Sequence, residues 1–370
     1  MLATSNISQD HPVSSMPTYG GVPVRNIWLL MLYANKDFPF RETDRATVEQ
    51  NPDELPDVIA EILLHIVTRR LRRNLSVGYR SNTAELTRVR GSIEHLQTQR
   101  KKLLLRGRVA CTFEELTIDN QRNRYVRTAL ETMDSLVRRK ELKHQCRSLA
   151  RVLQSMGVSN KVGTTYNPLY DRTGRRNAED RKMLSAAKLA FDLALPVNTY
   201  GRHYVTTPPD EIGFLRKLFE KAIAGFYELT LAEYGWKVHP GKKLNWQISR
   251  MDEEIRSILP QMQADIVLDH KSSGRRIVID TKFNKILTKG YYREQTLRSS
   301  YIYQMYAYLK SQQNSGDPLD EQASGMLLHP STGVSVDTSV TIQGQEIRFV
   351  TVDLTKRAAI IREQLLQLIS

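Results

Sequence analysis

Two acids and a lysine on neighbouring apolar segments are the residues of this chain best suited to chemistry. Asp265 lies in one β-branched apolar run, and Asp280 and Lys282 lie in the next. The turn-like residues 271–274 between the runs predict a hairpin. Because successive side chains of a strand alternate between faces, Asp280 and Lys282 point the same way. We therefore expect the two carboxylates and the ammonium group to converge at one end of the hairpin.

These residue types suit a magnesium ion and a phosphodiester. Magnesium prefers hard oxygen ligands and keeps several waters, so Asp265 and Asp280 suffice as metal ligands. The bound ion polarises a phosphate and activates a water, and Lys282 can orient that water or neutralise charge on the phosphoryl oxygens. The alternative is that Asp280 and Lys282 form a plain surface ion pair on an edge strand. The apolar surroundings favour the site, because buried ions are costly unless paired or metal-bound.

Flanking helices offer three accessory residues. Glu220 lies in an amphipathic segment, 214–229, and either faces the metal or is a solvated helix glutamate. Gln304 and Tyr308 lie four residues apart in a predicted helix, 294–312, and so share a face. They can hydrogen-bond Lys282 or a DNA phosphate, although for the tyrosines of that helix as a group we expect ordinary packing.

The elements that position these residues change character along the chain. Residues 1–19, rich in Ser, Pro, Thr and Asn, are typical of a disordered leader. Residues 20–200 predict a mainly helical α+β domain. Residues 196–210 are a candidate linker, and 201–370 mix strands with helices, which predicts an α/β domain with a central mixed sheet. The expected helices are a buried one at 23–34, then 53–75, a segment ending near 139, 142–156, 181–195, 212–234, 294–312 and 355–369. The expected strands are 236–250, 263–269, 275–283, 323–329 and 339–354 with a turn at 343–344.

Composition narrows the functional classes. The chain has 370 residues and a net charge of +14. Residues 201–370 hold 22 Lys and Arg against 19 Asp and Glu, so most of the excess lies before residue 201, where it favours DNA or an acidic protein as partner. The arginine-rich run 69–73 either contacts phosphates or ends a solvated helix. Only two cysteines, no apolar stretch of membrane-spanning length and no signal peptide indicate a cytoplasmic protein without a zinc site.

With these residues in place, the chain from about Pro23 to the C-terminus resembles the McrC family, the endonuclease subunits of McrBC modification-dependent restriction systems. Each motif is modest alone, and their order along the chain is more specific. The motifs are Pro23-Val24-Arg25-Asn26-Ile27, Arg90-Gly91-Ser92-Ile93, Thr112-Phe113-Glu114 with Asn123-Arg124, and Pro260, Asp265 and Asp280-Thr281-Lys282.

The resemblance implies a PD-(D/E)xK restriction-endonuclease-like fold for residues 201–370. It implies Asp265 and Asp280 as magnesium ligands and Lys282 as the catalytic lysine, with Glu220 and Gln304 matching accessory positions less securely. It further implies a partner, an McrB-like AAA+ hexamer that binds and hydrolyses GTP and reads modified cytosine in double-stranded DNA. Residues 20–200 would then dock in that ring and stimulate its GTPase. The absence of a G-x-x-x-x-G-K-[ST] loop agrees that this chain does not hydrolyse nucleotides itself.

Two other functions stay open at this point. The chain is either a non-cleaving adaptor that activates the GTPase through a degenerate nuclease fold, or a stand-alone DNA repair nuclease. The presence of Asp265, Asp280 and Lys282 argues against degeneration.

Overall fold

The computed structural model describes most of the chain, and its description covers residues 17–35, 38, 40–163, 165–168, 171, 178–197, 210–288, 294–313, 316–332 and 335–370. The candidate linker 196–210 lies almost wholly outside the described residues, as does the leader up to residue 16. At the end of that leader, Thr18–Tyr19 (β1) form a strand paired with Val22–Pro23 (β2), so these two residues are ordered, contrary to expectation.

The chain divides into two compact units. One comprises Met1–Leu55 together with Pro208–Ser370, and the other comprises Pro56–Thr207. The chain returns to the first unit at residues 207–208, and residues 20–55 lie with the C-terminal part and not with the helical part. The reason is a buried helix, Val24–Ala34 (α1), which packs along Glu211–Thr230 (α8).

The contact between these two helices is unusually close at one glycine. A Cβ atom built on Gly225 of α8 would lie 2.0 Å from the carbonyl oxygen of Tyr33 in α1. Any larger residue would push the helices apart, so the sequence needs glycine here. Apolar side chains of α1 such as Ile27 and Leu32 are fully buried by this packing.

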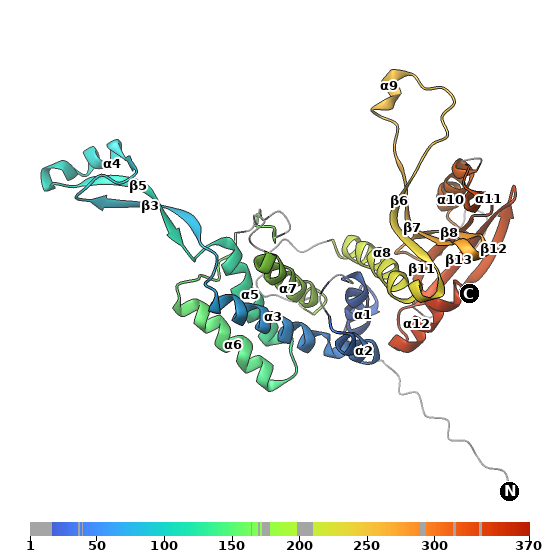
Figure 1. The fold of residues 1–370 in the computed structure, drawn as a ribbon, viewed down its shortest axis with the longest axis horizontal. Helices are drawn as coiled ribbons and strands as arrows, with labels where there is room; N and C mark the ends of the chain where they lie inside the picture. Colours follow the sequence, from blue (N-terminus) through green and yellow to red (C-terminus); the bar gives the residue numbers. More distant parts are fainter. Residues whose placement is uncertain are drawn as a thin grey trace, which may run out of the picture. The chain divides into compact units, whose positions relative to one another are not determined.

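The C-terminal part of this first unit is built on a six-stranded mixed sheet with the order β12-β13-β11-β8-β7-β6 (Figure 1). The neighbours β11 and β8, and β11 and β13, run parallel, and the other pairs run antiparallel. The strands are Lys237–Leu244 (β6), Met262–His270 (β7), Arg275–Thr281 (β8), Ser324–Ser331 (β11), Asp337–Ile342 (β12) and Gln345–Asp353 (β13).

Helices and short elements complete this unit. Met305 and Leu309 of α10 are buried against strand residues such as Val267 and Val278, and α8 packs on β6, β7 and β8. The remaining bounds are Glu42–Gln50 (α2), Pro52–Glu54 (η1), Ala232–Tyr234 (η4), Glu253–Arg256 (α9), Lys271–Ser273 (η5), Leu287–Thr288 (β9), Thr296–Leu297 (β10), Ser299–Gln312 (α10), Pro318–Glu321 (α11) and Ala358–Gln367 (α12).

The second unit is a helical body with a β-finger, so the expected mainly helical α+β character is found. Figure 1 shows β3 and β5 running outward from the helices, with α4 at their far end. The helices are Leu55–Arg72 (α3), which starts at the unit boundary, Gln121–Leu136 (α5), Lys140–Ser155 (α6) and Ala178–Ala194 (α7); the finger is Gly78–Leu86 (β3), Ser92–Ile93 (β4), His95–Arg100 (α4), Leu103–Arg106 (η2) and Val109–Thr117 (β5).

Ion pairs explain the arginine-rich run at the end of α3. Arg70 Nε lies 2.7 Å from Asp180 Oδ1, whose side chain is fully buried, and Arg73 pairs with Glu179. These ion pairs join the end of α3 to α7 within the unit. Across the described residues of both units, no helix combines the length and the apolar character needed to cross a membrane.

Candidate active site

The predicted hairpin brings Asp265 and Asp280 to one end of the sheet. Strands β7 and β8 pair antiparallel, with Gly274 at a positive φ of 66° closing the turn, and their register ends at Ile266 opposite Ile279. Asp265 and Asp280 are the next residue on each strand. Val267 and Val278, two residues further into the sheet, both belong to the core beneath α10. Because side chains two apart share a face, Asp280 lies on the α10 side with Val278. Hydrogen bonds from the neighbouring Thr281 hold the Asp265 carboxylate beside the same strand.

Strand β8 lies between β7 and β11, so it is a central strand. The Asp280 side chain is buried, with only 2% exposed, and the Lys282 side chain is 20% exposed. The alternative of a surface pair on an edge strand is therefore wrong. An ionised carboxylate at this depth needs positive charge nearby.

Asp280 receives less positive charge than its burial requires. Its Oδ2 lies 2.6 Å from Lys282 Nζ, and this contact is an ion pair without hydrogen-bond geometry to any described donor. Burial, followed by the negative charge of Asp265, raises the pKa of Asp280 to about 6, and Lys282 only partly opposes this. The site thus holds more negative charge than one lysine balances, and this excess is the electrostatic condition that favours a cation.

A hydrogen-bonded chain runs from the lysine into α10. Lys282 Nζ donates to Gln304 Oε1 at 3.2 Å, Gln304 Nε2 donates to the Tyr308 hydroxyl at 2.6 Å, and that hydroxyl donates to the Gln263 carbonyl at 2.9 Å. The predicted pair Gln304 and Tyr308 therefore shares a face and reaches the lysine. This series of hydrogen bonds orients Lys282 Nζ from the α10 side, while the ion pair with Asp280 holds it from the strand side.

The tyrosines of α10 divide between packing and exposure. Tyr308 is 7% exposed and packs in the core, whereas Tyr303 is 71% exposed, so the expectation of packing fails for Tyr303. Tyr301 packs against the core as expected for the group, and its ring also lies 5.0 Å from Lys282 Nζ in a cation–π contact that was not predicted. Helix α10 contains four tyrosines, so the sequence alone could not show which of them contacts the lysine.

Glu220 of α8 lies within electrostatic range of the same cluster. Burial raises the pKa of Glu220, and the charges of Asp265 and Asp280 raise it further, against Lys221 and Lys282. This glutamate is half-buried and not a simply solvated one. Within the described part of the chain, however, no group of three or more His, Cys, Asp or Glu side chains is placed to hold a metal ion. The donor set fits a cation held by two carboxylates and completed by waters.

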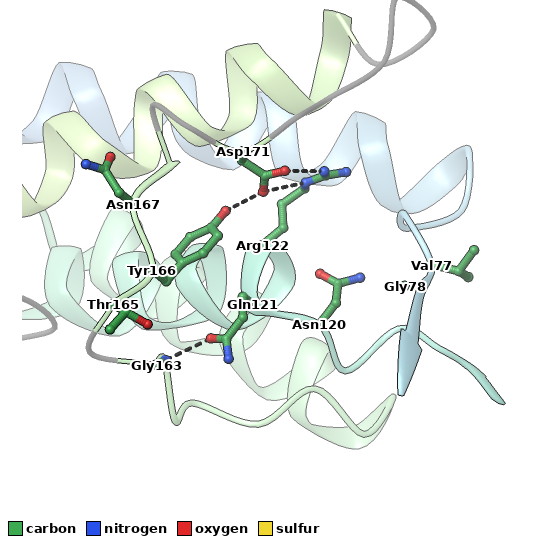
Figure 2. A pocket seen from close by; sticks show the side chains of 10 residues that line it. All are labelled: Val77, Gly78, Asn120, Gln121, Arg122, Gly163, Thr165, Tyr166, Asn167 and Asp171. Atoms are coloured by element: carbon green, nitrogen blue, oxygen red, sulfur yellow. Dashed lines mark hydrogen bonds and ion pairs between the residues drawn. The ribbon is translucent and has the colours of Figure 1, made fainter. Parts of the chain in front are cut away.

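Both cysteines, Cys111 and Cys146, are free and buried. The helical unit contains a separate open cavity of about 550 Å³, drawn in Figure 2. In it Arg122 is held by Asp171, and Tyr166 donates its hydroxyl proton to Asp171 at 2.6 Å. Because Arg122 also pairs with Asp180, its charge is neutralised within the unit.

Comparison with known proteins identifies the family. A model described as McrBC 5-methylcytosine restriction system component matches residues 5–330. The chain belongs to the McrBC restriction-system family. The type IV methyl-directed restriction enzyme EcoKMcrBC of Escherichia coli K12 is 25% identical over 350 residues, which are 94% of this chain and 97% of that protein.

Solved structures similar to this McrBC family member come from Thermococcus gammatolerans. A half-complex from a tetradecameric assembly of McrB AAA+ hexamers with bound McrC has 15% identity and a TM-score of 0.44, covering 94% of this chain and 76% of that one. A McrBC complex has 13% identity and a TM-score of 0.34, covering 58% and 74%.

Proposed function

We propose that this chain is the nuclease subunit of a modified-cytosine-specific restriction complex, with a PD-(D/E)xK-type domain that hydrolyses DNA phosphodiester bonds. The observation that carries this proposal is the buried Asp280, paired with Lys282 and adjacent to Asp265, in a member of the McrBC family. An adaptor that had lost catalysis would have no use for a buried, under-neutralised carboxylate, which lowers stability.

The residues divide the work of hydrolysis. Asp265 and Asp280 would hold magnesium, which when bound polarises the scissile phosphate and lowers the pKa of a water. Lys282, held by Gln304 and Asp280, places its ammonium group where it orients the attacking water or stabilises charge on the phosphoryl oxygens. Glu220 adds negative charge beside the two ligands and so strengthens the attraction for the cation.

The finger of the helical unit supplies the surface for a protein partner. Residues 88–108 contain seven basic residues and one acidic residue. Leu96, Leu104 and Leu105 of the same segment are 85%, 69% and 84% exposed. Exposed leucines are costly in water and typical of a protein interface, whereas DNA phosphates need cations alone. The partner implied by the family resemblance is an McrB-like AAA+ GTPase hexamer, and its GTPase would be stimulated by this contact.

A reconstituted cleavage assay tests the proposal. The full chain is incubated with cytosine-methylated duplex DNA, magnesium, GTP and the AAA+ partner, and each component is omitted in turn. Cleavage that needs all of them supports the proposed function. GTPase stimulation without cleavage would support the adaptor, and efficient cutting of unmethylated DNA by the lone chain would support a stand-alone repair nuclease.

A further inference from the structure

One oxygen of Asp265 is occupied by a single neighbouring residue. The backbone N–H of Thr281 donates to Asp265 Oδ2 at 2.7 Å, and the Thr281 hydroxyl donates to the same oxygen at 2.8 Å. Thr281 is buried, with 5% of its surface exposed. Two donors on one oxygen fix both the position and the rotation of the carboxylate.

The end of the hairpin explains why Thr281 is available. On its β11 side, Thr281 continues the parallel ladder as the partner of Leu328. On its β7 side the strand register stops at Ile266 and Ile279, so the Thr281 N–H lies beyond the last strand pair. The Asp265 carboxylate takes the place of the missing main-chain acceptor. The aspartate is thereby attached to the central strand that also holds Asp280 and Lys282.

This attachment leaves the other oxygen of Asp265 for a ligand. Among the described residues no donor hydrogen-bonds Asp265 Oδ1. The negative charge of Asp265 helps to raise the pKa of both Asp280 and Glu220, so all three carboxyl groups lie close enough to interact. We propose that Thr281 is a positioning residue that presents Asp265 Oδ1 to the divalent cation. This inference rests on the proposed function and names the residue that gives the first ligand its geometry.

The chemistry of the donor suits this task. A threonine hydroxyl and a backbone amide are neutral, so they hold the carboxylate without placing a second positive charge where the cation binds. With Oδ2 engaged, Asp265 presents a single oxygen, which agrees with the few protein ligands and narrow geometry that magnesium accepts. Hydrogen bonds to metal-binding carboxylates commonly change metal affinity or activity about 10- to 100-fold.

The test measures binding of Mn²⁺, a magnesium substitute, to the full-length chain by titration calorimetry, without DNA or partner. Thr281→Val keeps the branched shape and removes the hydroxyl, and Thr281→Ser keeps the hydroxyl and removes a methyl group. Thr351→Val is the matched control, because Thr351 is a comparably buried threonine of strand β13 in the same sheet. Asp280→Ala reports on the metal site itself.

We expect Thr281→Val to weaken Mn²⁺ binding about tenfold or more, with Thr281→Ser and Thr351→Val within about twofold of the parent chain. Equal losses in Thr281→Val and Thr281→Ser would assign the effect to packing and overturn the inference, as would unchanged affinity in Thr281→Val. Mn²⁺ binding that survives Asp280→Ala, or is absent from the parent chain, would instead overturn the metal site of the proposed function, and the inference with it.

Discussion

Asn26 Nδ2 donates a hydrogen bond to the carbonyl oxygen of Leu354 at 2.7 Å, although 328 positions separate them in the sequence. A second bond from the same nitrogen reaches the carbonyl of Lys356 at 2.9 Å. Asn26 is 1% exposed, and these bonds attach α1 to the segment that follows β13. Asn26 belongs to one of the motifs on which the family resemblance rests, and its structural task is to join the two ends of the chain.

Replacing Asn26 by alanine should lower the free energy of unfolding by about 2 kcal/mol, because the buried carbonyl of Leu354 and the partly buried carbonyl of Lys356 lose their donor. Chemical denaturation with urea measures the change. Asn35→Ala is the control, since among the described residues the Asn35 side chain bonds only the local carbonyl of Met31, and we expect a loss below about 1 kcal/mol there. Similar losses in both variants would contradict the assigned role.

Asp280→Ala should abolish DNA cleavage in the reconstituted complex while leaving partner binding and GTPase stimulation intact. The substitution removes a proposed ligand and the counter-charge of Lys282 but touches no finger residue. Cleavage and GTP hydrolysis are measured on the same preparation. Loss of all three activities together would show that the variant had misfolded or that the two functions share this site.

Gln304→Leu should slow cleavage about tenfold or more without changing GTPase stimulation, because Lys282 loses its hydrogen-bond partner on α10. Tyr308→Phe should have a smaller effect, since Gln304 keeps its bond to the lysine while losing the hydroxyl behind it. Single-turnover cleavage rates separate the two. If Tyr308→Phe slowed cleavage more than Gln304→Leu, these hydrogen bonds would not act by orienting Lys282.

Helix α6 carries a basic face, and we predict that this face contacts DNA phosphates. Lys140, His144, Arg147 and Arg151 recur at helical spacing and are exposed, on the side away from the buried Leu142, Cys146, Ala150 and Leu153. Arg147 pairs with Asp134, and no ion pair is found for Lys140 or Arg151 within the described residues.

The double variant Lys140→Gln with Arg151→Gln should therefore weaken DNA binding by the complex. It should also reduce the slope of log affinity against log salt by about 0.9 for each phosphate that the variant no longer neutralises. Fluorescence anisotropy across a salt series measures this slope. Lys237→Gln, at an exposed position of the sheet unit, serves as the control. An unchanged slope in the double variant would leave α6 as a solvated face.

Acid should destabilise the sheet unit through His329. Burial, with help from the charges of Lys282 and Arg298, lowers the pKa of His329 to about 4, although its hydrogen bond to the Asn284 carbonyl opposes this shift. The unfolded chain, with a histidine pKa of about 6.5, then binds more protons than the folded chain between these two values. Stability contributed by the neutral ring is complete above about pH 6.5 and is lost as the pH falls toward 4.

At pH 5 the contribution of His329 to the free energy of unfolding should be about 2 kcal/mol lower than at pH 7. His329→Gln removes the titrating group, so its free energy of unfolding should fall less between pH 7 and pH 5 than that of the parent chain. Urea denaturation at both pH values provides the comparison. An identical fall in both proteins would place the acid sensitivity elsewhere.

Local patterns predicted the site better than they predicted the architecture around it. Alternation and the turn at 271–274 correctly predicted the hairpin and the shared face of Asp280 and Lys282, because both depend on neighbours in the sequence. The spacing of Gln304 and Tyr308 likewise predicted their shared helix face. The sequence could not show that these side chains reach the lysine, since that depends on how α10 packs on the sheet.

Long-range features left no local signal. Helix α1 has the composition of any buried helix. Its contact with Gly225 and its hydrogen bonds from Asn26 to the segment after β13 show that it belongs with the C-terminal part. Thr281 stands in the sequence as the middle residue of a motif, yet its bond to Asp265 arises from the place where strand pairing ends. The finger strand β5 was not predicted as a strand, because its inner and outer residues do not alternate cleanly.

The unit that contains the sheet is assembled from both ends of the polypeptide, with Pro56–Thr207 inserted between them. During synthesis α1 leaves the ribosome long before α8 and β13 exist, so its apolar side chains have no native partner at that stage. The inserted unit, by contrast, is continuous in the sequence and can fold as soon as it has been translated. The central sheet around the carboxylate cluster can therefore be completed only after β13 has been synthesised, long after the inserted unit has had time to fold.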